Sequence, residues 1–364
     1  MNLLQKIKIN IEILFFIFSY KSNNNSRNEN LLLINTGQIG DLVVSSLLFE
    51  NQEFLGKFNK VYFLMKDSYL EIFKDYNGKI EIINFEYSKY KYSIPYKLKF
   101  LKMIRELNIE TSINLTADRG IINEELTHLA NANETIALNK RKKYLGRFWG
   151  FYFDKKYSRF IGLDKFNEYE KHIDLLKYFD NEKEIVFSDN IFDNGKYIPN
   201  NTYLNSIVIA PFSSEKNRDW QPDKFKKIIS TLNSKYHIVL IGSKEQEKSL
   251  LELKGTNHGV SILAGELKLN EIPTIIKASR LFIGLDSGMT HIALKAGVPL
   301  VAIIGGGQFG RFFPFKESDK VKYLFNELDC FSCEWQCILK EKECITKVTV
   351  ERVYSIICQI LECE

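Results

Sequence analysis

The chain has 364 residues, more than one ordinary hydrophobic core supports, and it predicts two domains of roughly 150–200 residues each. A composition of 45% apolar and 26% charged residues excludes a disordered chain and is typical of a globular protein. The net charge of +5 fits an anionic substrate or an acidic membrane surface, but it is too small to indicate nucleic-acid binding.

The first 20 residues carry apolar side chains at helical spacing along one face. The uninterrupted apolar run at 13–18 is far shorter than the roughly 20 residues that span a bilayer, and no small-residue cleavage site follows it. Two interpretations stay open: a helix packed on the protein, or a helix lying on a membrane surface. With the polar stretch at 21–30 as a linker, residues 1–30 form an N-terminal amphipathic segment and linker.

The first half of the chain alternates strand and helix patterns. An apolar run at 31–35 is closed by Thr-Gly and followed by Gly40 and a helical pattern at 41–49. Further elements are predicted as strands at 60–65, 79–84 and 111–115 and as a helix at 96–107. Such alternation is typical of a parallel sheet covered on both faces, which predicts a Rossmann-like domain at 31–200.

The pattern restarts after a polar, turn-rich stretch at 189–205. Strands are predicted at 206–210, 237–241, 261–263, 281–284 and 300–304, and helices at 222–232, 269–278 and 290–296. This α/β pattern predicts a second doubly wound domain at 201–348 and a C-terminal helix at 349–364 that returns to the first domain. Two such domains would face a central cleft lined by the carboxyl ends of both sheets, where ligands usually bind.

The segment at 284–299 carries the most chemical information. A strand ends at Asp286, and Ser287 and Gly288 open a helix whose first amides suit a phosphate, because they are unpaired and carry the positive end of the helix dipole. Asp286 can orient these amides or accept a hydrogen bond from a sugar hydroxyl, and His291 lies on the first turn beside the same pocket. The alternative is an ordinary strand-to-helix turn with an aspartate cap.

The segment at 210–222 is another loop between a strand and a helix. Two hydroxyls and two cations within six residues form a candidate diphosphate clamp: Ser213, Ser214, Lys216 and Arg218. Arg218 can bind phosphate oxygens in bidentate fashion. Trp220 is predicted to anchor the loop by packing, and the alternative for the segment is a solvated charged loop.

The segment at 35–47 contains Gly37-x-x-Gly40, which lacks the full spacing of a dinucleotide fingerprint. We assign Gly37 and Gly40 to a loop on the acceptor side. Asp41, at the start of the following helix, either caps the helix or acts as a general base facing the cleft.

In chain order, these segments resemble glycosyltransferase family 9, the heptosyltransferases: an I-G-D loop, a P-x-S-S…R-x-W segment and a D-[ST]-G-x-x-H segment, over about 31–349. The resemblance implies a GT-B fold, a nucleotide-activated heptose donor, and neither a metal nor another cofactor; no D-x-D triad occurs in the chain. In such a fold the domain at 31–200 would bind the acceptor and the domain at 201–348 would bind the nucleotide sugar. Carried over by position, Asp41 would be the catalytic base. The residues that would contact donor phosphates are Ser213, Ser214 and Arg218, and those that would line the donor site are Asp286, Ser287, Gly288 and His291.

Three positions depart from the family pattern. Phe212 stands where a small residue or histidine is usual, Arg218 where lysine is common, and Gly305-Gly-Gly-Gln308 where Gly-Pro-Thr is common. We expect an inverting, metal-independent glycosyltransferase that moves heptose from ADP-heptose onto a lipopolysaccharide or related glycan. A nucleotide-sugar epimerase and a non-catalytic nucleotide-sugar-binding protein are the alternatives.

The acceptor side is predicted from charge. Basic residues cluster in the first domain: Lys89, Lys91, Lys97, Lys99, Lys102, Lys140, Arg141, Lys142, Lys143 and Arg147. They suit a lipid-linked anionic glycan at the inner face of the cytoplasmic membrane, with no nucleic-acid partner; the alternative is a solvated face. Asp118 and Arg119 end a strand and are candidates to touch the acceptor.

A cysteine-rich segment follows the second domain's last predicted strand, with Cys330, Cys333, Cys337 and Cys344. Three interpretations stay open for it: a structural zinc site through four thiolates, reduced packing thiols, or a redox or disulfide role.

Overall fold

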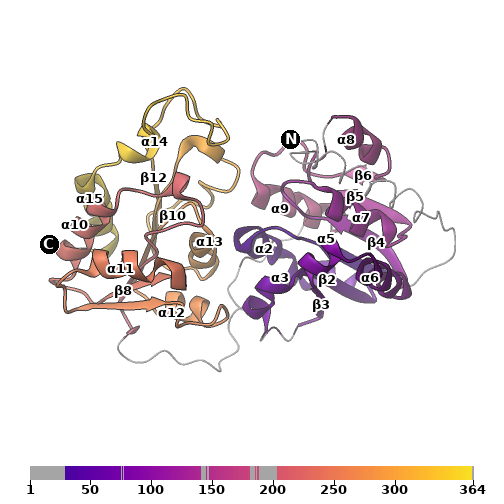
Figure 1. Ribbon diagram of the computed structural model, residues 1–364, viewed down its shortest axis with the longest axis horizontal. Helices are drawn as coiled ribbons and strands as arrows, with labels where there is room; N and C mark the ends of the chain where they lie inside the picture. Colours follow the sequence, from indigo (N-terminus) through magenta and orange to yellow (C-terminus); the bar gives the residue numbers. More distant parts are fainter. Residues whose placement is uncertain are drawn as a thin grey trace. The chain divides into compact units, whose positions relative to one another are not determined.

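The computed structural model describes residues 29–74, 76, 78–140, 145, 147–180, 185, 187 and 203–362. The chain divides into two compact units, each built on its own six-stranded sheet (Figure 1). Unit 1 comprises residues 1–70 and 77–186, and unit 2 comprises residues 71–76 and 187–364. The amphipathic pattern predicted for the first 20 residues lies outside the described residues.

The sheet of unit 1 is parallel throughout, in the order β3-β2-β1-β4-β5-β6. Its strands are β1 (Asn30–Ile34), β2 (Lys60–Lys66), β3 (Ile80–Phe85), β4 (Ile109–Asn114), β5 (Glu134–Ala137) and β6 (Arg159–Phe160). Its helices are α2 (Ile39–Ser45), α3 (Leu47–Glu50), α4 (Gln52–Gly56), α5 (Tyr87–Tyr92), α6 (Ile94–Glu106), α7 (Ile121–Leu129), α8 (Arg147–Asp154) and α9 (Glu168–Phe179), with a 3₁₀ helix, η1 (Asp67–Phe73). This is the strand order of a Rossmann sheet, which reverses between β1 and β4.

Both faces of the unit 1 sheet are covered. Every residue of β1 is buried, which explains its run of apolar residues without alternation. One face packs against the helices α5 to α8 in a single cluster that includes Phe100, Leu126 and Phe153. The predicted helix at 41–49 is divided into α2 and α3 at Ser46, whose hydroxyl donates to the Val43 carbonyl at 2.6 Å and competes with the helical hydrogen bonds.

The sheet of unit 2 repeats this topology, in the order β12-β11-β10-β7-β8-β9 and again all parallel. Its strands are β7 (Ile207–Ile209), β8 (Ile238–Gly242), β9 (Val260–Ala264), β10 (Leu281–Leu285), β11 (Leu300–Ile303) and β12 (Val321–Leu324). Its helices are α10 (Pro222–Leu232), α11 (Glu247–Lys254), α12 (Ile272–Lys277), α13 (Gly288–Lys295), α14 (Glu343–Thr346) and α15 (Val350–Leu361), with the 3₁₀ helices η4 (Lys216–Arg218), η5 (Lys244–Gln246) and η6 (Gly306–Gln308).

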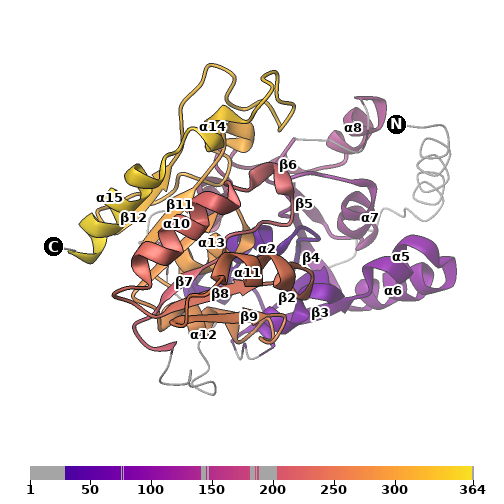
Figure 2. The same cartoon turned by 60° about the vertical axis from the view of Figure 1, so that its left-hand side comes forward.

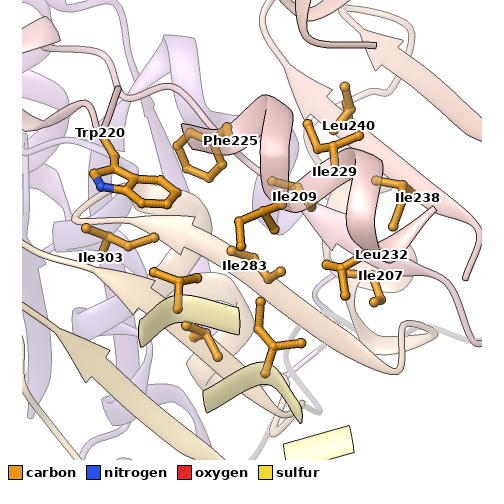
Figure 3. Close-up of a cluster of buried hydrophobic side chains, with 14 of the residues drawn as sticks. Ile207, Ile209, Trp220, Phe225, Ile229, Leu232, Ile238, Leu240, Ile283 and Ile303 are labelled. Atoms are coloured by element: carbon orange, nitrogen blue, oxygen red, sulfur yellow. The ribbon is translucent and has the colours of Figure 1, made fainter. Parts of the chain in front are cut away.

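One hydrophobic core joins α10, α11 and α15 to the same face of this sheet (Figure 2). In the close-up of Figure 3, Trp220 lies beside Phe225, and their ring centroids are 5.0 Å apart in an edge-to-face arrangement. The helix predicted at 349–364 is observed as α15, but its buried residues belong to the core of unit 2 rather than returning to the first domain: Val353, Ile357 and Leu361.

The parallel strand order of both sheets determines where their loops gather. Because all strands in a sheet are parallel, the loops that leave their carboxyl ends gather along one edge. In both units the strand order reverses next to the first strand, between β1 and β4 and between β7 and β10. Ligands of open α/β sheets bind at such reversal points, and the three segments predicted to be functional follow β1, β7 and β10.

Candidate functional site

Asp41 is the third residue of α2 and is half-buried. Its Oδ2 accepts a hydrogen bond from the backbone N–H of Gln38 at 2.8 Å, and the Gln38 side chain completes a capping box. The helix cap considered from the sequence is therefore present. This cap is compatible with the other predicted role of Asp41, that of a general base, because an ionised carboxylate has about four acceptor sites on its two oxygens.

The loop that precedes Asp41 is held by Asn35, which is fully buried. Its side-chain oxygen accepts from the Gly37 N–H at 2.9 Å, and its Nδ2 donates to Ser45 Oγ at 2.7 Å and to the Asp41 carbonyl at 3.2 Å. Gly40 lies within the first turn of α2. One buried amide thus fixes both ends of the turn that presents the carboxylate.

Lys66 and Tyr69 lie near Asp41 and were not predicted from the sequence. Lys66 ends β2, the strand that pairs with β1, and its ammonium lies 4.7 Å from the centroid of the Tyr87 ring. Burial lowers the pKa of Lys66, while the negative charge of Asp41 acts in the opposite direction. The Tyr69 hydroxyl donates to the side chain of Gln38, the residue that caps α2. The sequence signal that could have identified Lys66 is a lysine at the carboxyl end of β2, the strand that pairs with β1.

Two predicted acceptor contacts in unit 1 are wrong. Arg119 is fully buried and paired with two carboxylates: Nε lies 2.6 Å from Glu124 Oε1, and Nη1 lies 2.7 Å from Asp154 Oδ1. Lys97 is also buried, with Nζ 2.8 Å from Glu125 Oε2. Both cations are interior ion-pair partners because the folded chain places helix α7 carboxylates beside them.

Other members of the predicted basic cluster lie on the surface. Lys99 and Lys102 are exposed on α6, and Lys89 is exposed and paired with Glu86 at 2.6 Å. Of the second basic group, Lys140 is exposed, with its ammonium 5.0 Å from the centroid of the Phe160 ring, whereas Arg141, Lys142 and Lys143 lie outside the described residues.

In unit 2, Ser213 uses its polar groups within its own loop. Its hydroxyl lies 2.8 Å from Asp219 Oδ1 and 2.6 Å from the Glu215 carbonyl oxygen, and its N–H also donates to Asp219 Oδ1. Ser214 and Lys216 are exposed on the same loop. Ser213 therefore shapes the loop, whereas the structure does not bring Ser214 and Lys216 to the other candidate residues.

Arg218 reaches from this loop to the end of the neighbouring strand β10. Its Nη1 donates to the Asp286 carbonyl at 3.4 Å, and its Nε is buried without a hydrogen-bond partner in the described part of the chain. The predicted packing role of Trp220 is confirmed: the side chain is fully buried and its indole N–H donates to the Val348 carbonyl at 3.0 Å. The anchored Trp220 holds the loop that presents Arg218.

Asp286 follows β10 directly and is 7% exposed. Burial raises the pKa of its carboxyl group, and the positive charges of Arg218 and Arg311 oppose that rise. Ser287 is the N-cap residue of α13, yet its hydroxyl caps no backbone N–H and is buried without a partner among the described residues. Gly288 begins the helix, so unpaired amides stand next to two guanidinium groups.

His291 is buried on α13 against two aromatic rings, with centroid distances of 4.4 Å to Phe313 and 5.3 Å to Phe312. Burial lowers its pKa to about 3, and the charge of Arg218 contributes in the same direction. The imidazole is therefore neutral at pH 7. The structure brings Arg218, Asp286 and His291 together, as predicted.

Two further residues belong to this cluster. Arg311 is buried beyond η6 and its charge acts on Asp286. The Trp335 ring centroid lies 5.7 Å from the guanidinium carbon of Arg218. Sequence reasoning missed both, because they follow Asp286 by dozens of residues and belong to segments without a phosphate-binding pattern.

The cysteine-rich segment has no disulfide at Cys330, Cys333, Cys337 or Cys344. Within the described ranges, no group of three or more His, Cys, Asp or Glu side chains is arranged to hold a metal ion. The thiols of the other three cysteines are close enough to contribute to the raised pKa of Cys344, whose main cause is burial. No helix in the described part of the chain has both the length and the apolarity that a membrane crossing requires.

The sequence matches the family model for glycosyltransferase family 9 (heptosyltransferase) over residues 170–342. It is 29% identical over 28% of its length to lipopolysaccharide heptosyltransferase 3 of Escherichia coli, and 27% identical over 40% to lipooligosaccharide heptosyltransferase 2 of Campylobacter jejuni. These matches span 31% and 46% of the two relatives. A longer match, with lipopolysaccharide heptosyltransferase 1 of Campylobacter coli, has 22% identity over 76% of this chain and 83% of that protein.

The fold is similar to those of two solved E. coli proteins. Heptosyltransferase WaaC with ADP-2-deoxy-2-fluoro heptose aligns with a TM-score of 0.67 at 12% identity, covering 90% of this chain and 98% of that one. ADP-heptose lps heptosyltransferase II aligns with a TM-score of 0.65 at 15% identity, covering 92% and 99%. The two parallel sheets thus form a GT-B fold, and over residues 170–342 the sequence is similar to glycosyltransferase family 9, the heptosyltransferases.

Proposed function

We propose that this protein is an inverting, metal-independent glycosyltransferase that moves heptose from ADP-heptose onto a lipopolysaccharide or related surface glycan. The observation that carries the proposal is the cluster of Arg218, Asp286 and His291 at the carboxyl ends of β7 and β10. The names of the relatives support heptose as the sugar, and WaaC has been solved with a fluorinated ADP-heptose.

In this proposal, Asp41 is the base. It removes the proton from an acceptor hydroxyl, whose oxygen attacks the anomeric carbon of the donor from the face opposite the diphosphate. The bond to the diphosphate breaks as the new glycosidic bond forms, so a single displacement inverts the configuration. A positioned general base contributes about 10²–10⁴-fold to such a step. The capping bond from Gln38 orients the carboxylate before the acceptor binds.

The departing diphosphate gains negative charge, which Arg218 and the first amides of α13 at Ser287 and Gly288 would stabilise. These donors occupy fixed positions in a partly buried site, where electrostatic stabilisation is stronger than in water. Lys216 and Ser214, exposed on the same loop, would join them when the donor binds. Neutral His291 would line the donor site without adding charge.

The acceptor would be a lipid-linked anionic glycan, and the protein would work in the cytoplasm at the inner face of the membrane. Exposed lysines of α6, Lys99 and Lys102, offer positive charge for such a surface. Arg119 and Lys97 take no part in this proposal because interior carboxylates neutralise them.

The test is calorimetric binding of ADP, UDP and GDP with EDTA present, for the wild type and Arg218→Ala. Selective ADP binding that weakens about 10–100-fold in the variant is the expected result, since a charge-assisted hydrogen bond is lost. Arg280→Ala is the matched control, because Arg280 is exposed at the opposite end of β10. Preference for UDP or GDP would contradict the proposal that the transferred sugar is heptose from ADP-heptose. Donor turnover without any acceptor would indicate an epimerase instead.

A further inference from the structure

Three buried hydrogen-bonding atoms lack a partner along one edge of the unit 2 sheet. They are Arg218 Nε in the loop after β7, Ser287 Oγ after β10, and Trp335 Nε1, and no described residue pairs with any of them. A buried polar group without a partner is costly, so native proteins rarely retain one unless something else supplies the partner. Three together indicate a ligand with several oxygen atoms.

Trp335 reaches this edge by packing on the glycines that follow β11. A Cβ built on Gly307 would stand 2.2 Å from Trp335 Cδ2, and one built on Gly305 would stand 2.7 Å from Trp335 Cη2. Only glycine allows the indole to lie so close to this backbone. Because β11 pairs with β10, the indole comes to lie next to the residues that follow β10.

The segment that carries Trp335 is locked to the same turn. The N–H of Ser332 donates to the Gly306 carbonyl at 2.7 Å, and that of Glu334 donates to the Gly307 carbonyl at 2.9 Å. Ser332, Glu334 and Trp335 all have φ between +52° and +66°, a conformation that residues other than glycine rarely adopt. Such a backbone persists only where its surroundings determine it, which indicates that the position of the indole matters.

We propose that Trp335 is a donor-binding residue whose indole N–H donates a hydrogen bond to a diphosphate oxygen of the nucleotide sugar. The inference rests on the proposed function. An indole N–H can only donate, so its partner must be an acceptor, and the guanidinium carbon of Arg218 lies only 5.7 Å from the ring centroid. An anionic oxygen is the acceptor that suits both groups at once. Arg218 and Trp335 thus hold the diphosphate from two neighbouring segments.

The main experiment compares wild type with Trp335→Phe, which keeps a ring on the glycine turn and removes the N–H. Binding of ADP should weaken by about tenfold, the loss of one hydrogen bond to a charged group, and any weaker binding of UDP or GDP should fall by the same factor because the contact is with the diphosphate. Trp149→Phe, in unit 1, is the matched control and should bind as wild type does. A thermal melt of each variant should show no loss of folding.

The outcomes separate the two proposals. If wild type binds a nucleoside diphosphate and Trp335→Phe binds it equally well, the role of Trp335 is wrong while the proposed function stands. If wild type binds none, both fail.

A second measurement uses the wild-type chain and so does not depend on the variant folding. The chain has three tryptophans, so labelling with 5-fluorotryptophan gives three ¹⁹F signals. ADP should shift one of them, and Trp149→Phe should not remove that signal. Trp220, fully buried with its N–H already bonded, should not respond. No shifted signal, or a shift confined to the Trp149 signal, would overturn the inference.

Discussion

The carboxylate of Asp41 lies directly against the backbone of Gly37. A Cβ at position 37 would stand 2.5 Å from Asp41 Oδ2 and 2.6 Å from both Asp41 Cβ and Cγ, closer than real Cβ contacts. Gly37 precedes the I-G-D loop. Glycine is required at this position because the side chain of the proposed base leaves no room for a Cβ, and not because of an unusual backbone angle φ. Whatever displaces that carboxylate should affect chemistry before it affects folding.

Gly37→Ala tests this contact. The added methyl group must push Asp41 aside, and a misplaced base should lower kcat by about tenfold to a hundredfold, within the range that general-base catalysis contributes. ADP affinity should stay within about twofold, because the donor residues belong to other segments. Steady-state kinetics and calorimetry measure the two effects. Gly56→Ala is the matched control, since no atom lies within 4 Å of a Cβ built there; equal kcat in both variants would contradict the prediction.

Asp41→Asn removes the basic oxygen while keeping the size of the side chain and an oxygen that can cap α2. We expect kcat to fall by at least about a hundredfold and ADP binding to be nearly unchanged. Glu53→Gln, an exposed carboxylate on the nearby helix α4, should retain wild-type turnover. If Asp41→Asn kept most of its activity, the base would have to be another group.

Lys97→Met should lower the free energy of unfolding by about 3–5 kcal/mol, because it leaves Glu125 buried and without its cation. Lys102→Met, on the exposed side of the same helix, should change stability by less than about 0.5 kcal/mol. Urea denaturation followed by circular dichroism measures both. Adding Glu125→Gln to Lys97→Met should recover part of the loss, and a stable single variant would mean that the ion pair is not structural.

Stability should fall as the pH drops from about 6.5 towards 4, partly through His172. Burial lowers the pKa of His172 to about 4, well below its unfolded value of 6.5, so the unfolded chain binds a proton that the folded chain does not. The free energy of unfolding therefore decreases with falling pH, by up to about 1.4 kcal/mol per pH unit for this group. In His172→Gln the slope over this window should be smaller by that amount, although loss of the contact with Ser45 lowers stability at pH 7. An unchanged slope would exclude His172 as a source.

The apolar runs and the turns that close them were enough to predict most strands and the two doubly wound domains. The reason is that strands buried on both faces need continuous apolar residues, as β1 and β10 show. The first helix was predicted as one piece, since periodicity does not register the side-chain bond that Ser46 makes to the backbone. Helix α9 and strand β5 were not identified, because polar residues in them are buried by partners distant in sequence.

The residues of the candidate site can also be divided into those that sequence patterns identified and those that they did not. Asp41, Arg218, Asp286 and His291 could be named as candidates from sequence because each lies in, or within one helical turn after, a short and chemically distinctive loop that follows a strand. The sequence by itself thus determined the fold class and the loops that contain the candidate site, since both depend on local patterns.

Only the tertiary structure decided which charged groups are available and which distant residues join the site. It buries Arg119 and Lys97 against carboxylates, and it brings Arg311 near Asp286 and Trp335 near Arg218. Burial and ion pairing depend on segments that lie far apart in the chain and come into contact only when the parallel strands align. The spacing of residues within one segment does not predict that contact.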